Sequence, residues 1–261
     1  MTGMIPRALQ IAIAFLFGLL FGSFYNCMAM RIVRGQNWVS DRSRCPHCAH
    51  ELGAADLIPL VSFGLTRGKC RYCNERISLR YPVTELLFGC ITALIMWRFG
   101  LSFNTIRYFI FAGALFVLTL TDLEERLIPN GCILAALIGW AATEPWLFVS
   151  VRDLLTHIGA MAGFVIAILA VVFVMDRILK KDSMGGGDVK LIGVLALYLG
   201  PVSMMFALFF SCMLGIGYAV LARRFRRGEA VAFGPCLSAA GFLMAIFGDP
   251  LVNWYLSFLM V

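Results

Sequence analysis

Two aspartates lie at the edges of long apolar runs and could act together on a substrate. Asp122 follows the run TIRYFIFAGALFVLTLT, and Asp188 stands between the glycines at 185–187 and the apolar run VKLIGVLALYL. A carboxylate within or beside the hydrocarbon of a membrane is unfavourable unless it is paired, hydrated or functional. Two carboxyl groups held close together retain one proton between them, so one can activate a water while the other protonates a carbonyl or a leaving amine. The pair therefore predicts aspartyl peptide hydrolysis.

Each aspartate also has a simpler interpretation. Asp122 could mark the end of a helix in water, and Asp188 could cap the helix that follows it. The glycines before Asp188 favour the catalytic interpretation, because residues without a side chain let the backbone approach a substrate or the partner aspartate closely.

Four cysteines form two Cys-x-x-Cys pairs, with 21 residues between the pairs. Thiolates at this spacing are typical of a tetrahedral zinc site, which gives a short loop a fixed shape. A disulfide is disfavoured because the loop is expected to face a reducing compartment. His47 and His50 are alternative ligands, but four cysteines already complete the coordination shell. We expect structural zinc at Cys45, Cys48, Cys70 and Cys73.

The elements that must position these residues are membrane helices. Of the 261 residues, 61% are hydrophobic and only 14% are charged, and the mean hydropathy of +0.85 excludes an ordinary soluble domain. At about 20 residues per crossing, the apolar runs predict an all-α, polytopic membrane helix bundle of about eight spans. The run 189–200 is too short to span upright, and Gly200-Pro201 predicts a kinked or re-entrant segment there. The spans are expected at 11–30, 83–98, 105–121, 129–149, 154–176, 189–200, 202–222 and 231–247.

The chain is expected to have three parts: a first transmembrane span (1–30), a small cytoplasmic zinc-ribbon-like insert (31–82), and a transmembrane aspartyl peptidase domain (83–261). The first span is expected to be retained, because it is longer than the apolar core of a typical signal peptide and lacks a small-residue cleavage pattern. Its Gly18 and Gly22 could admit another helix closely, although glycine is common in membrane helices in any case.

Basic residues predict the orientation. Nine Lys and Arg lie between Arg31 and Arg80, and two further basic clusters lie at 177–181 and 223–227. With eight crossings, all three clusters fall on one side, which the positive-inside rule makes cytoplasmic. The same count brings Asp122 and Asp188 to that face. The net charge of +7 is therefore attributed to topology and to contact with anionic membrane lipid, not to nucleic-acid binding.

Short motifs spread over nearly the whole chain carry a family resemblance. Gly185-Gly186-Gly187-Asp188 is similar to the GxGD signature of a class of membrane aspartyl proteases, and the chain as a whole resembles the bacterial type IV prepilin peptidase family. The other matching pieces, in family order, are GSFYN at 22–26 with Arg31, the two cysteine pairs, ISLRYP at 77–82 with Glu85, Asp122 with IPN at 128–130, GDVK at 187–190 and FGP at 233–235.

The resemblance implies an enzyme that removes the basic leader from type IV prepilins and pseudopilins at the cytoplasmic face of the bacterial inner membrane, for a type IV pilus or type II secretion. It implies Asp122 and Asp188 as the catalytic pair and the four cysteines as the zinc set of bifunctional members. Many members then methylate the new amino terminus with S-adenosylmethionine. No glycine-rich nucleotide-binding fingerprint locates that cofactor in this chain, and the insert before Cys45 is shorter than in many relatives.

Other functions remain open at this stage. Interrupted helices and membrane aspartates also suit a proton-coupled transporter whose zinc ribbon docks a cytoplasmic partner, and a non-catalytic zinc-ribbon scaffold is a third reading. Glu85 could serve methyl transfer or bind the leader, but acids also favour helix amino termini. His157 is interpreted as a polar group near a helix end.

Overall fold

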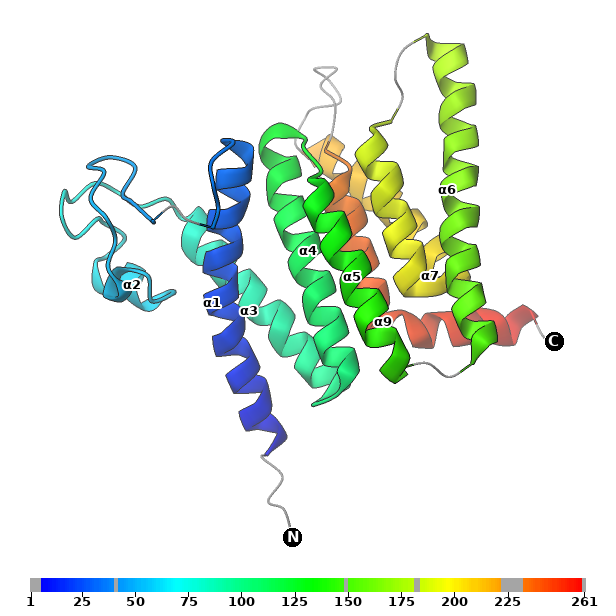
Figure 1. The fold of residues 1–261 in the computed structure, drawn as a ribbon, viewed down its shortest axis with the longest axis horizontal. Helices are drawn as coiled ribbons and strands as arrows, with labels where there is room; N and C mark the ends of the chain where they lie inside the picture. The colour runs from blue at the N-terminus through cyan, green and yellow to red at the C-terminus, as the bar shows by residue number, and fades with distance from the viewer. Residues whose placement is uncertain (1–5, 40–41, 148–149, 181–183, 222–231, 260–261) are drawn as a thin grey trace. The chain divides into compact units, whose positions relative to one another are not determined.

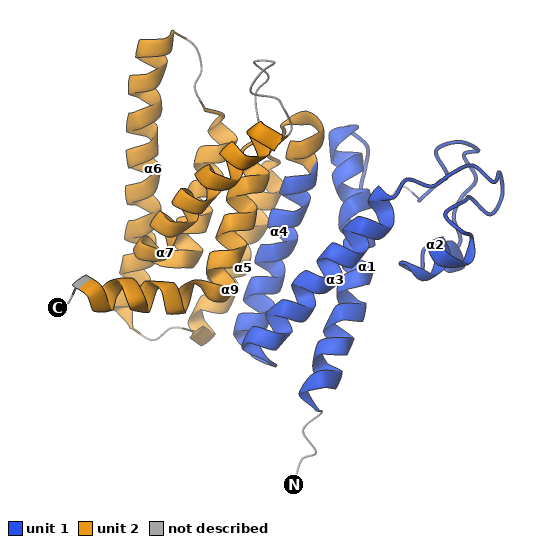
Figure 2. Ribbon diagram, turned by 180° about the vertical axis from the view of Figure 1, so that it is seen from behind, with its two compact units in different colours: residues 1–120 blue, residues 121–261 orange. Residues whose placement is uncertain are grey.

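The computed structural model describes residues 6–39, 42–147, 150–180, 184–221 and 232–259 (Figure 1). The chain forms two compact units, residues 1–120 and 121–261 (Figure 2). Apart from two isolated β-bridges, the regular structure of the described residues is helical. The predicted all-α class is therefore confirmed. The sequence predicted three functional parts, with boundaries at residues 30 and 82, which are not the boundaries of the two compact units. The three-part division stays a prediction.

Glycines let two helices of the first unit approach closely. This unit contains α1 (Arg7–Val33), α3 (Arg80–Phe99) and the greater part of α4 (Phe103–Glu125). A Cβ atom on Gly18 would lie 1.9 Å from Oγ1 of Thr92, and one on Gly22 would lie 2.9 Å from Cα of Glu85. The Thr92 hydroxyl also donates a hydrogen bond to the carbonyl of Ala14, at 2.9 Å. The small-xxx-small pair therefore marks a backbone-to-backbone helix contact, as one of its two interpretations predicted.

The insert between α1 and α3 has little apolar core of its own. It contains the short helices η1 (Ala54–Asp56) and α2 (Val61–Leu65), neither of which has a buried residue. Two antiparallel bridges, Arg44 with Glu51 and Lys69 with Arg76, close two tight turns. Polar contacts and the cysteines must therefore hold the shape of the insert.

The second unit packs around the first part of α7. It contains the end of α4, then α5 (Asn130–Leu147), α6 (Val151–Leu179), α7 (Gly186–Leu221) and α9 (Gly234–Leu259). In α7, the side chains of Leu191 and Leu195 are completely buried, as expected of a segment that is apolar on all sides. The hydroxyl of Tyr198 donates to the carbonyl of Ala136, at 2.7 Å, and ties α7 to α5.

Helix α7 is broken at its predicted weak point. Gly200 adopts φ 73° and ψ 177°, and Pro201 follows it, so α7 consists of two arms (Figure 1). Proline has no N–H, which leaves the carbonyl four residues earlier, that of Leu197, without its helical donor. Nδ1 of His157 on α6 lies 2.8 Å from that carbonyl oxygen and replaces the missing bond. His157 therefore stabilises a kink, a role that its position near a helix end did not reveal.

Six described helices are long and apolar enough to cross a membrane, namely α1, α3, α4, α6, α7 and α9. The count differs from eight for two reasons. The predicted spans 189–200 and 202–222 are the two arms of α7, and α5, which covers most of the span predicted at 129–149, is not among the six. The chain is a multi-pass membrane protein, as the sequence predicted.

Candidate aspartate site and cysteine cluster

Asp122 lies in the last turn of α4, where it is only 5% exposed. The helix ends just beyond it because Arg126 adopts a left-handed conformation, with φ 53°. The N–H of Arg126 donates to the carbonyl of Asp122, at 3.0 Å, and closes the final turn. The backbone thus holds the Asp122 carboxyl at a helix end inside the unit.

Asp188 lies in the first turn of α7. Its backbone N–H donates to the carbonyl of Gly185, at 3.1 Å, which starts the helix directly after the glycines. A Cβ atom on Gly185 would lie 3.4 Å from Oδ2 of Asp188, whereas one on Gly186 would meet nothing within 4 Å. The half-buried Asp188 is therefore presented by a helix start that has little side-chain bulk around it.

Two contacts bring the beginnings of α5 and α7 together. Gly187 packs against Ile128 in the connection that follows α4, so closely that a Cβ on Gly187 would lie 2.7 Å from that of Ile128. Nζ of Lys190 donates to Oδ1 of Asn130, at 2.9 Å. Since Asp188 lies between Gly187 and Lys190, these contacts place it beside the chain segment that leaves Asp122.

The two carboxyl groups are close enough to act on each other. The charge of Asp122 acts on Asp188, and the backbone N–H of Gly234, at the start of α9, donates to the Asp122 carboxylate. One oxygen of each group, Oδ2 of Asp122 and Oδ1 of Asp188, is buried without a hydrogen-bond partner among the described residues. Buried polar atoms normally have partners, so these two oxygens mark a place for water or a polar substrate group.

The four cysteines of the insert converge. Their sulfur atoms all lie within 4.8 Å of one another, and Sγ of Cys45 lies 3.9 Å from Sγ of Cys73. Four sulfurs bound tetrahedrally at about 2.3 Å from a zinc ion would be about 3.8 Å apart. All of the cysteines are free thiols. A hydrogen bond from the backbone N–H of Cys48 lowers the pKa of Cys45 to about 6.

The two cysteine pairs have the same backbone conformation. In each pair the first cysteine donates its N–H across the turn, Cys45 to His50 at 3.0 Å and Cys70 to Glu75 at 2.8 Å. The residue after the second cysteine, Ala49 or Asn74, is left-handed and returns its N–H to the first cysteine, at 2.9 Å in both pairs. Two matching turns thus face four thiols toward a common centre.

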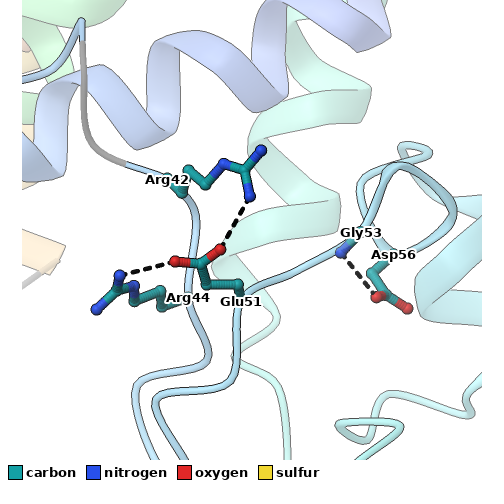
Figure 3. A network of polar contacts seen from close by, with 5 residues as sticks. All are labelled: Arg42, Arg44, Glu51, Gly53 and Asp56. Carbon is teal, nitrogen blue, oxygen red and sulfur yellow. Dashed lines mark hydrogen bonds and ion pairs between the residues drawn. The ribbon is translucent and has the colours of Figure 1, made fainter.

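Ion pairs and hydrogen bonds fix the chain on either side of the first of these turns (Figure 3). Glu51 accepts from Arg42 at 3.0 Å and from Arg44 at 2.7 Å, and these arginines hold the pKa of Glu51 below its usual range. The carboxylate of Asp56 accepts from the N–H of Gly53 at 3.1 Å. It also accepts from the hydroxyl of Tyr72, so it ties η1 to the second cysteine turn.

One buried polar residue attaches the insert to α3, and another joins α3 to α1. The Glu85 carboxylate on α3 accepts from the N–H of Leu60 at 2.9 Å, and Nε of Arg80 donates to Oδ1 of Asn26 at 3.1 Å. Asn26 is completely buried. The sequence predicted methyl transfer or leader binding for Glu85, and it gave Asn26 no role beyond its place in the GSFYN motif. The signal that could have found these two contacts was the presence of a polar residue inside each of two predicted spans.

Comparison with known proteins covers nearly the whole chain. Residues 16–99 match the model of the bacterial peptidase A24 N-terminal domain, and residues 109–220 match that of the type IV leader peptidase family. A prepilin leader peptidase/N-methyltransferase of Bacillus subtilis (strain 168) is 34% identical over 95% of this chain and 98% of its own. Proteins with the same name from Neisseria gonorrhoeae (95% and 95%) and Stutzerimonas stutzeri (94% and 93%) are 31% and 30% identical. No solved structure matches the chain.

Proposed function

This chain belongs to the type IV leader peptidase family, and on that premise we propose that Asp122 and Asp188 are the catalytic pair of an aspartyl endopeptidase that removes the basic leader of prepilins or pseudopilins. Its relatives are named as both peptidases and N-methyltransferases, and the chain is an enzyme of this class. The observation that carries the aspartyl mechanism is that the end of α4 and the start of α7 lie together, and each presents a buried carboxyl oxygen with no hydrogen-bond partner among the described residues.

The arrangement suits general acid–base hydrolysis. The ionised aspartate takes a proton from a water, whose oxygen forms a bond to the scissile carbonyl carbon while the protonated aspartate gives its proton to the carbonyl oxygen. As the tetrahedral intermediate collapses, the carbon–nitrogen bond breaks and the leaving amine takes a proton. The contacts of Ile128 with Gly187 and of Asn130 with Lys190 hold the helix ends in register, which supplies positioning.

The positive-inside rule supports an active site that faces the cytoplasm of the bacterial inner membrane. The basic insert and the connections next to both aspartates fall on one side in the predicted topology. The apolar segment of the substrate would then stay within the bilayer, while its basic leader stays in the cytoplasm.

Asparagine substitutions test the proposal. Asp122→Asn and Asp188→Asn retain size and hydrogen-bonding capacity but cannot transfer the proton, so purified variants in detergent or vesicles should no longer remove the leader. Asp249→Asn, an exposed carboxyl on α9 of the same unit, is the matched control and should cleave normally. Normal cleavage by either catalytic variant, the result expected of a transporter or a scaffold, would refute the assignment.

We propose zinc at Cys45, Cys48, Cys70 and Cys73, since four converging thiols fit its preferred ligand set. Zinc would stabilise an insert with little core of its own. The second activity named in the relatives would use S-adenosylmethionine to methylate the new amino terminus. Mass spectrometry of a prepilin incubated with the enzyme and this methyl donor separates the activities, because loss of the leader reports cleavage and an added methyl mass reports methylation.

A further inference from the structure

An apolar cavity opens beside the candidate catalytic pair in the second unit. It has a volume of about 230 Å³ and lies between the end of α4, the second arm of α7 and the start of α9. Its walls include Leu123, Leu214, Tyr218, Pro235, Cys236 and Ala239. Leu123 and Ala239 are exposed, so the cavity is open at its edge.

The wall of this cavity continues directly into the surroundings of Asp122. Leu123 follows Asp122 directly along α4. Cys236 lies close enough to Asp122 for the charge of the carboxylate to act on its thiol. Pro235 follows Gly234, whose N–H donates to the Asp122 carboxylate. A side chain in the cavity would therefore belong to a substrate residue close to the hydrolysed bond.

We propose that this cavity receives one large apolar side chain from the apolar segment of the substrate, within the first helical turn after the cleaved bond. The proposal rests on the peptidase function proposed above and names the residues that hold the substrate. Leu214, Cys236 and Ala239 offer no charge that would suit the basic leader, which leaves the apolar segment as the matching part of the substrate.

Size supports an occupant no smaller than an aromatic or branched aliphatic side chain. A dry, apolar protein cavity of about 150 Å³ binds benzene. The cavity of about 230 Å³ beside Asp122 is large enough for a ring of that size with its linking carbon. Burial of such a side chain would fix the substrate along its helix and so set which peptide bond meets the carboxyl pair.

The test combines one enzyme variant with a short series of substrates. Ala239→Leu adds three carbons at an exposed wall position, which the fold should tolerate, and it reduces the space available. Ala167→Leu, at an exposed position on α6 away from the cavity, is the matched control. The substrates are one prepilin and four variants of it, each with alanine at one of the first four positions after the cleaved bond, and kcat/KM for leader removal is measured for each pair.

With the parent prepilin, Ala239→Leu should lower kcat/KM by about tenfold or more, whereas Ala167→Leu should leave it unchanged. One alanine substrate should be cut poorly by the wild-type enzyme and should lose no further rate with Ala239→Leu, because its missing side chain no longer needs the space. Leu214→Ala, which enlarges the cavity, should improve a substrate with a tryptophan at that same position.

Three results would overturn the proposal. The first is that Ala239→Leu behaves like Ala167→Leu. The second is a combined result: Ala239→Leu slows the cleavage of all five substrates equally, and Leu214→Ala does not change the substrate preference. A cavity that holds a lipid chain would give this result, and the Leu214→Ala measurement covers the case in which Ala239→Leu is misfolded. The third is that the sensitive position lies in the leader. Each of these leaves the aspartate assignment standing, because that assignment depends on Asp122→Asn and Asp188→Asn alone.

Discussion

Replacing Gly187 with alanine should damage catalysis without removing any chemical group. The new Cβ would lie 2.7 Å from Cβ and 3.1 Å from Cδ1 of Ile128. Carbon atoms are attracted best at about 3.5–4.0 Å, so the start of α7 and the connection at 128 must separate by about 1 Å. Such overpacking costs about 1–3 kcal/mol, which is offset in part by about 1 kcal/mol of better helix propensity. The protein should therefore fold, with a slightly lower melting temperature.

The expected catalytic effect is much larger than the effect on stability. A displacement of about 1 Å between reacting groups can reduce a rate roughly a hundredfold, and Asp188 is the neighbour of Gly187. We therefore expect leader cleavage to fall by about that factor, measured as single-turnover cleavage of a purified prepilin. Gly186→Ala is the control, since its Cβ would meet nothing within 4 Å and cleavage should change by less than about twofold. Equal rates for the two variants would refute the idea that the glycine contact sets the spacing of the aspartates.

Three further substitutions probe other parts of the chain. The wild-type protein should contain about one zinc ion per chain, and Cys45→Ser should lose this ion and reduce methylation more than cleavage. Wild-type protein that contains no metal in reducing buffer would contradict the metal site. His157→Phe should lower the free energy of unfolding by about 1–3 kcal/mol, because the carbonyl of Leu197 loses its donor, and an unchanged thermal unfolding curve would contradict this. Gly18→Leu should separate α1 from α3 and abolish stable expression in the membrane. Gly163→Leu, at a position where a Cβ meets nothing within 4 Å, should leave expression unchanged. Equal expression of the Gly18 and Gly163 variants would exclude tight packing at Gly18.

The sequence predicted the helices well because each carries a long apolar run. It also predicted the break at Gly200-Pro201, since proline removes a helix hydrogen bond wherever it occurs. The convergence of the four cysteines followed from ligand spacing, which is a local property. In each case the information lies within a few residues of the feature.

Contacts between distant segments could not be predicted in the same way. Nothing around Gly187 identifies Ile128 as its neighbour, and nothing around Asp122 identifies the N–H of Gly234 as its donor. The family resemblance grouped these segments as motifs but did not say which atoms touch. The number of spans was uncertain for a related reason, because hydropathy alone does not show that α7 continues through a kink.

The kink in α7 should also make the second unit responsive to the thickness of the lipid around it. The first arm, 186–199, measures roughly 21 Å at 1.5 Å per residue, against a hydrocarbon layer of about 30 Å. When Asp188 is held at one surface, the break and the His157 hydrogen bond lie inside the acyl chains and not at the opposite headgroups. A thinner bilayer would relieve this mismatch, and a thicker one would strain the helix that carries half of the acid–base pair.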